Sequence, residues 1–474
     1  MNKGIVNLSY PNIYCYWIRT RVHKFITKTL LISLLFGFLF SCVSDKPPEK
    51  EVELPAENKW LNPKGQAFQI EKDWWKKFGD ETLNSLIDKA VAQNLNLQVM
   101  LERTKLAEKL ITEANLKKIP KVSADFGKEK TNSANSQTQE NFTASAGASW
   151  EIDIWGKFSK MSSANLAEYK ASEADWRASY LKLIKDITVN YITLRQYDEQ
   201  RLLFEESLNN SDQLVKIYKQ RFDNGVEDKT NLSLQNAESL RLKSELVEID
   251  RARAVIANQI SILLGEASAT TKLTPSKLTD TLKPLIFPND IKANLLERRP
   301  DIIAAELRVQ KDYQMSEYTR AARLPSVSLG LSLNLKNDAI STLTQGWATA
   351  ILPKISFPAL DPQTKINVEK QDINLEITKK QYKETVIKAI GEVEDSLINR
   401  QARLKRMELE TRRFKELTDA DVKNALSHKA GVISTLERIQ FQQQLISSRQ
   451  SILNFYSLEL QDTVKLFTAL GGGW

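Results

Sequence analysis

The sequence predicts a mainly α-helical protein with four β-strands per chain. Three observations carry this prediction. Glycine and proline number only 16 and 14 among 474 residues, two stretches of about 65 residues contain no proline, and four short segments tend to alternate apolar with polar side chains. Scarce helix breakers favour long helices, and alternation with a period of two is typical of half-buried strands.

Residues 1–41 are expected to be a signal peptide. A basic segment, residues 19–28, precedes an apolar one, residues 30–40, which is shorter than the roughly 20 residues that a membrane-spanning helix needs. The sequence up to Cys42 resembles the lipobox of bacterial lipoproteins, which implies that Cys42 is lipidated; the alternative is an ordinary signal with a chance cysteine. Residues 42–75, with several prolines and charges, are predicted to form a tether from this anchor.

Composition excludes several classes of function. The net charge of +8 falls to +3 without residues 1–41, which hold five basic residues and no acid, so nucleic acid is not an expected partner. After the signal the chain keeps one cysteine and one histidine, which argues against a disulfide framework and a transition-metal site. No phosphate-binding glycine loop or nucleophile elbow occurs, and Glu392, Glu394 and Asp395 fit charged wall positions better than acid–base catalysis. We therefore expect neither an enzyme nor a cofactor.

The chain contains two copies of one unit. Gly225 and Gly431 are 206 residues apart, and so are Gly265 and Gly471, while Ile119-Pro120 and Leu324-Pro325 are 205 apart. Matched glycines at one offset indicate an internal duplication. Residues 76–265 and 291–474 are the predicted repeats, and residues 266–290 are the linker between them, in an equatorial region.

Each copy is expected to contain a helix, two strands, a long helix and a shorter helix that returns beside it. A helix of about 65 residues reaches roughly 100 Å, which is deeper than one globular core, so the helices predict a wall or a cylinder. The alternative is a coiled-coil stalk. The expected helices are Thr82–Lys118, Phe158–Phe222, Lys229–Leu264, Ile291–Arg323, Gln363–His428 and Ile433–Leu470.

Four strands are expected, with polar loops at Thr131–Glu140 and Asn337–Gln345. Their length of about 10–12 residues suits a tilted crossing of an outer membrane, although a soluble sandwich would show the same alternation. Four strands are too few to close a membrane barrel, and lipid tolerates no open sheet edge. Three chains would supply twelve strands, and the same closure would roll the helices into a tube. The expected strands include Val122–Phe126, Phe142–Ile154, Val327–Leu335 and Gly346–Phe357.

Several segments, taken in order, resemble the TolC-like outer-membrane efflux proteins, in the lipoprotein branch that serves RND pumps. The resemblance covers nearly all of the chain after the signal. It implies a homotrimer with a 12-stranded barrel in the outer membrane, a periplasmic α-barrel, and passive conduction of molecules delivered by an inner-membrane RND pump and a periplasmic adaptor. The segments are Trp74–Leu83, Trp150–Lys157, Leu295–Ile302, Leu324–Leu329, Glu392–Asp395 and Leu470–Trp474.

The resemblance also implies site residues. Asn224, Gly225 and Val226, and likewise Ala430, Gly431 and Val432, match the hairpin tips on which adaptors dock; the alternative is that the glycines are only helix caps, and the two roles are compatible. Glu437 and Gln440 match the positions that narrow the periplasmic aperture, although a solvated helix face is the alternative for either.

Two other functions stay open at this point: an outer-membrane-anchored coiled-coil structural lipoprotein, and a TolC-like conduit for type I protein secretion. The sequence does not name the transported substrate.

Overall fold

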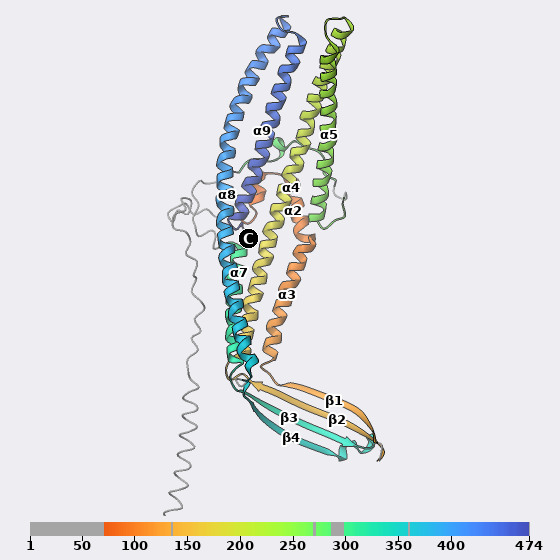
Figure 1. Cartoon of the computed structure of the whole chain (residues 1–474), viewed down its shortest axis with the longest axis vertical. Helices are drawn as coiled ribbons and strands as arrows, with labels where there is room; N and C mark the ends of the chain where they lie inside the picture. Colours follow the sequence, from red (N-terminus) through yellow and green to blue (C-terminus); the bar gives the residue numbers. More distant parts are fainter. Residues whose placement is uncertain (1–70, 134–135, 269–271, 286–297, 359–360, 474) are drawn as a thin grey trace, which may run out of the picture. The chain divides into compact units, whose positions relative to one another are not determined.

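The computed structural model describes residues 71–133, 136–268, 272–285, 298–358 and 361–473 (Figure 1). All of these belong to one compact unit, Glu51–Trp474. The signal peptide 1–41, Cys42, the tether as far as residue 70 and residues 291–297 of the second repeat lie outside the described residues.

The expected long helices and their return helices are confirmed to within two residues. They are α4 (Lys157–Asp223) with α5 (Lys229–Leu263), and α8 (Pro362–Lys429) with α9 (Thr435–Ala469). At 1.5 Å per residue, α4 and α8 are each roughly 100 Å long. A short helix, α6 (Leu278–Thr281), lies in the expected linker.

The first helix of each copy differs from the expectation. The continuous helix expected over Thr82–Lys118 is wrong, because Asn94 interrupts it between α2 (Glu81–Gln93) and α3 (Leu95–Leu116). Asn94 is extended and caps α3 by accepting a hydrogen bond from the amide of Leu97 (2.9 Å). In the second copy, α7 (Pro300–Ala321) begins at a proline, which favours the first helical turn.

The four strands form one antiparallel sheet in the order β1-β2-β3-β4. Their bounds are Lys121–Ser133, Ser136–Ile152, Ser326–Asn337 and Trp347–Ser356. The polar loop expected over Thr131–Glu140 is wrong, since β1 and β2 pair through most of it. The second expected loop contains a 3-10 turn, η3 (Ile340–Gln345).

Helix α4 lies at the centre of the helical packing. It contacts α3, α5, α7 and α9, whereas α8 contacts α7 and α9. The apolar core includes Ile184, Ile187 and Tyr191 of α4 and the turn η1 (Trp74–Phe78). Trp74 and Trp75 are buried, and Trp74 stacks on Phe467 with ring centroids 4.8 Å apart. Among the described residues, packing against the core therefore starts at Trp74, two residues before the expected start of the first repeat at residue 76.

Candidate functional site

The sheet has one continuous apolar face. Cross-strand register places the apolar residues of all four strands in common rows, such as Val122, Ala148, Leu331 and Ile351, or Phe126, Ala144, Leu335 and Trp347. Many of these side chains are exposed, and Val122, Phe126 and Ile351 are each more than 60% exposed. A soluble sheet would cover such a face, so this one is suited to lipid.

The dimensions of this face fit a bilayer. Ile152 and Phe142 are ten residues apart on β2. At about 3.4 Å per residue and a tilt of about 40°, that stretch rises about 26 Å, close to the roughly 25 Å apolar band of outer-membrane barrels. Aromatic residues stand at both limits, with Trp150 and Trp155 toward the helices and Phe126, Phe142 and Trp347 toward the far end. Trp150 and Trp155 donate their ring N–H groups to the carbonyls of Lys118 (2.8 Å) and Pro325 (2.7 Å), which holds both indoles in place.

The opposite face of the sheet is polar, with charged side chains such as Asp125, Glu129 and Lys336 beside rows of small ones. One row runs Ser123, Gly147, Ser332 and Ala350 across the four strands. This face is compatible with water.

Among the described residues, none of the helices combines the length and the apolar character that a bilayer crossing requires.

The two hairpin tips have the same backbone geometry. Gly225 and Gly431 both adopt φ = 72°. Each glycine amide donates to the carbonyl three residues before it, at 2.9 and 3.0 Å, and the next residue donates to the carbonyl five before it, at 2.8 and 2.9 Å. This pair of bonds is the Schellman helix end, which needs a residue in the left-handed conformation. The structure thus accounts for both glycines as helix caps.

Exposed valines follow both glycines. Val226 is 67% and Val432 is 75% exposed, beside Asn224 and Ala430 at the ends of the long helices. The six tip residues named from the sequence therefore form two small groups with matching backbones and an apolar side chain in solvent.

Glu437 lies in the first turn of α9 and closes a capping box with Ser434. Its carboxylate accepts from the amide (2.7 Å) and the hydroxyl (2.8 Å) of Ser434, while the Glu437 amide donates to the Ser434 hydroxyl oxygen (3.2 Å). The backbone hydrogen bond from Ser434 is the main cause that holds the pKa of Glu437 below its usual value. Gln440 is exposed one turn further on, on the same side of the helix. The spacing Ser-x-x-Glu was a readable signal for this cap, and the sequence interpretation missed it.

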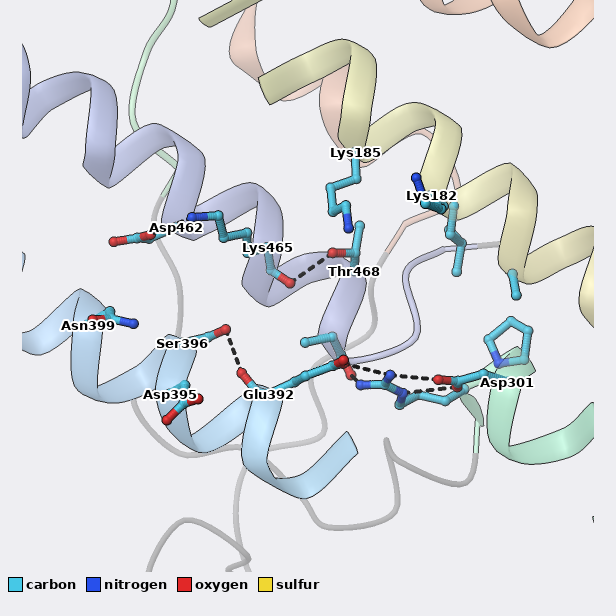
Figure 2. Close-up of a pocket in the computed structure, with 15 residues that line it drawn as sticks. Lys182, Lys185, Asp301, Glu392, Asp395, Ser396, Asn399, Asp462, Lys465 and Thr468 are labelled. Carbon is cyan, nitrogen blue, oxygen red and sulfur yellow. Dashed lines mark hydrogen bonds and ion pairs between the residues drawn. The ribbon is translucent and has the colours of Figure 1, made fainter. Parts of the chain in front are cut away.

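Charged residues surround a cavity of about 470 Å³ between α4, α7, α8 and α9 (Figure 2). Its lining includes Lys182, Lys185 and Lys465 as well as Glu392 and Asp395. Lys182 pairs with Asp186, and Lys465 pairs with Asp462 (3.4 Å). The cavity therefore combines paired charges rather than a nucleophile and its base. In the described part of the chain, no cluster of histidine, cysteine and carboxylate side chains is placed to hold a metal ion.

Arg299 joins three helices beside this cavity. It is buried at the start of α7, where it donates to both Asp301 oxygens (3.0 and 2.7 Å), to Glu392 on α8 (2.8 Å) and to the Ala469 carbonyl near the end of α9 (2.9 Å). Burial lowers the pKa of Arg299, but these two carboxylates outweigh it and the net pKa is raised. Glu392 is thus a structural partner, as the sequence suggested, but Arg299 was not singled out.

A second buried charge cluster anchors the linker. Asp198 on α4 accepts from Arg195 (3.0 Å) and Arg253 (2.5 Å), and the same two arginines donate to the Thr274 and Leu273 carbonyls (2.6 and 2.9 Å). Nearby, burial and then the hydrogen bond to Asp80 (2.5 Å) raise the pKa of Tyr191 to about 12. No local sequence pattern reveals this cluster, because its members are up to 79 residues apart.

These features define a class of protein in which a β-sheet has one lipid-facing and one water-facing side and is continued by long helical hairpins. Residues 86–266 and 293–472 match the family described as outer membrane efflux protein, so the chain belongs to this family and its place is the outer membrane.

Two relatives illustrate the likeness. The probable outer membrane lipoprotein SilC of Salmonella typhimurium is 25% identical over 464 residues, covering 94% of this chain and 99% of SilC. The pyoverdine export outer membrane protein OpmQ of Pseudomonas aeruginosa is 25% identical over 428 residues, covering 85% of this chain and 88% of OpmQ.

The fold matches solved outer-membrane channels. The open-state structure of the MtrE channel of Neisseria gonorrhoeae superposes with a TM-score of 0.76 at 21% identity, covering 90% of this chain and 97% of MtrE. The predicted fold class, with long helices and four strands per chain, is thereby confirmed. Family membership also decides against the structural lipoprotein that the helices alone allowed.

Proposed function

We propose that the chain is the outer-membrane channel of a tripartite RND-type efflux system. It works as a homotrimer that passively conducts molecules from a periplasmic adaptor and an inner-membrane pump to the exterior, without catalysis. The observation that carries this proposal is that, in a single chain, both the sheet and the helical layer end in unpaired edges.

The sheet is open at β1 and β4. Within the described residues each of these strands has one neighbouring strand, and the apolar face between them is exposed or half-exposed. A lipid environment leaves no free backbone donors or acceptors, so the edges must pair with other copies. Three copies supply twelve strands, an even number within the range of bacterial barrels.

The helical layer is open at corresponding sides. Among the described residues, α3 and α5 pack chiefly on α4, while α8 packs on α7 and α9, so α3 and α5 form one edge and α8 the other. Both edges carry exposed apolar side chains, which favours head-to-tail contact between copies and a closed ring. They include Leu106 on α3, Val247 on α5, and Ile387 and Ile398 on α8.

The repeats and the anchor complete the proposal. Residues 76–265 and 291–474 would be structural repeats joined by residues 266–290, which the equal return helices and the shared offset of the tips support. Cys42 would carry the lipid. The similarity to SilC, which is named a lipoprotein, supports that role.

Conductance of the purified, full-length protein in planar bilayers tests the channel. We expect discrete pores from a trimer. Absence of pores from a protein that is folded and trimeric by light scattering would overturn the proposal.

The tips are the proposed docking sites for the adaptor. Replacing Val226 or Val432 by aspartate puts a charge on an exposed apolar position without touching the backbone caps. We expect weaker co-purification of the adaptor with pores unchanged, whereas adaptor retention equal to wild type would remove the docking role.

Glu437 and Gln440 are the proposed aperture residues, and the capping box calls for a matched control. Glu437→Gln removes the charge, whereas Ser434→Ala weakens the same cap and leaves the charge. If Glu437 lines the aperture, only Glu437→Gln changes cation selectivity. Equal effects of the two variants would assign Glu437 to the cap alone. Gln440→Glu should increase cation selectivity if that position also faces the pore.

A further inference from the structure

The apolar face of the sheet ends in a small charged group. In the described part of this face, the charged side chains are Lys128, Lys130 and Glu140, and all three lie past the row of Phe126 and Trp347. Lys130 pairs directly with Glu140 across the strands, and Lys128 pairs with Phe142. The group therefore begins where the aromatic residues end.

The strand register sets the direction of these side chains. Because successive residues of a strand alternate between faces, Lys128 and Lys130 share the face of Val122, Ala124 and Phe126. They belong to the lipid-facing side of the sheet and not to the side with the small polar residues. They also lie near the β1–β2 turn, at the far end from α3 and α4.

The two lysines carry more positive charge than their shared carboxylate neutralises. Glu140 accepts from both ammonium groups, with Nζ to carboxylate distances of 2.8 Å for Lys128 and 3.1 Å for Lys130. One carboxylate thus neutralises two cations incompletely. Both lysines remain half exposed, at 49% and 57%, and Lys128 lies 5.3 Å from the centre of the Phe142 ring, which orients its stem along the strand surface.

We propose that Lys128 and Lys130 form a binding site for the phosphate group of an anionic lipid in the outer leaflet. This inference rests on the proposed function: when the helices lie in the periplasm with the adaptor, the β1–β2 turn, at the end of the sheet far from α3 and α4, lies outside. The acyl chains of such a lipid would contact the row of Phe126, Leu335 and Trp347, and its phosphate would reach the two ammonium groups just beyond. Charge-assisted hydrogen bonds to phosphate are strong, and at the edge of a bilayer water competes with them less than in solution.

Glu140 gives the site a second property. With no lipid bound, the Glu140 carboxylate lies between the two ammonium groups and contacts both of them. The two lysines are therefore already placed on either side of an anion. A phosphate must share or displace this carboxylate, and therefore Glu140 should weaken the lipid and limit its residence time. If the two lysines attracted lipid only as unconnected surface charges, lipid binding would not depend on Glu140 in this way.

The test uses the full-length trimer in detergent, with bisphosphorylated lipid A as the probe and native mass spectrometry as the readout. We expect Lys128→Gln/Lys130→Gln to lower lipid A retention about tenfold and Glu140→Gln to raise it severalfold. Lys121→Gln is the matched control, since Lys121 is an exposed lysine of the same strand on the polar face. Dephosphorylated lipid A should bind the wild type and the double variant alike.

Several outcomes would overturn the proposal. One is equal lipid A retention by the wild type and the double variant, which would leave the lysines as partners of Glu140 only. Others are an equal loss in Lys121→Gln, or displacement of lipid A by millimolar inorganic phosphate. Circular dichroism and trimer mass exclude misfolding of the variants. Pore conductance, measured on the same samples, separates a failure of this site from a failure of the channel proposal.

Discussion

The two hairpins share a backbone plan but differ in the side chains that secure it. At offset 206, the Schellman ends of α4 and α8 have the same hydrogen bonds, and so do the ends of α5 and α9. Asn94 precedes α3 and Arg299 precedes α7, each at the N-cap position. Both side chains donate to a carbonyl near the end of the return helix, that of Leu263 for Asn94 and that of Ala469 for Arg299. The two hairpins thus share backbone geometry, while the neutral amide of Asn94 in one corresponds to the buried guanidinium of Arg299 in the other.

The largest expected difference lies at this pair. Arg299→Ala removes contacts to two carboxylates and one carbonyl, whereas Asn94→Ala removes one cap and one hydrogen bond. We expect losses of about 2–4 and about 1–2 kcal/mol in unfolding free energy, respectively, the first discounted because Asp301 and Glu392 keep contact with solvent.

Chemical denaturation of the trimer measures these losses. Lys388→Ala on α8, an exposed lysine in a pair with Glu384, serves as the control and should lie within about 0.5 kcal/mol of wild type. Equal losses for Asn94→Ala and Arg299→Ala would show that the added charges of the second copy contribute nothing.

The tips should respond equally. A Cβ at Gly225 or Gly431 would meet nothing within 4 Å, so alanine there costs only the left-handed backbone conformation. We expect about 1–2 kcal/mol of local stability to be lost in each case, measured by hydrogen exchange at residues 222–230 and 428–436. A clearly larger effect at one tip would break the symmetry and reveal a contact that acts only there.

The first turns of the two return helices, α5 and α9, should respond unequally to the loss of an interhelical ion pair. In the second hairpin Arg438 pairs with Asp421 between α8 and α9, while the first hairpin has Leu232 and Val215 at the same offset. Arg438→Met should speed amide exchange in the first turns of α9 about fivefold, because the pair is only partly screened by solvent. Arg438→Met should leave amide exchange in α5 unchanged. The control Arg241→Met, at an exposed arginine of α5, should leave amide exchange in both hairpins unchanged. Faster exchange in both hairpins would mean that Arg438 acts on the whole assembly.

The smallest expected effect is acid sensitivity at the two helix starts. Each return helix has a carboxyl group of lowered pKa in its N-terminal cap: the pKa of Asp228 in α5 is lowered chiefly by the backbone amide of Asn231, and that of Glu437 in α9 chiefly by the backbone amide of Ser434. A lowered carboxyl pKa contributes stability above its unfolded value, and this stability is lost as pH falls through the folded value. Between pH 5 and 3, amide exchange should therefore rise at the start of α5 and at the start of α9. Asp228→Ser should remove the rise at the start of α5 alone; its persistence there would exclude the cap as the cause.

The sequence predicted the regular parts of this fold because their signals are local. The long helices are indicated by the absence of proline, and β3 is indicated by the alternation of apolar and polar residues from Val327 to Leu335. The break at Asn94 is not a local signal, since its amide is held by Leu263, 169 residues away. The extension of β1 and β2 past Lys130 was missed because polar residues there give no alternation, although backbone pairing continues. Arg299 and the Asp198 cluster depend on long-range contacts, whereas the cap at Glu437 was readable in its spacing.

The row of Ser123, Gly147, Ser332 and Ala350 has a consequence for transport. Such short side chains occupy little of the space inside a twelve-stranded ring and present few groups that could grip a passing molecule. A solute there would meet mostly mobile water and would diffuse nearly as it does in bulk solution. At this row the membrane section would sort molecules chiefly by diameter, so one exit could serve chemically unlike cargo.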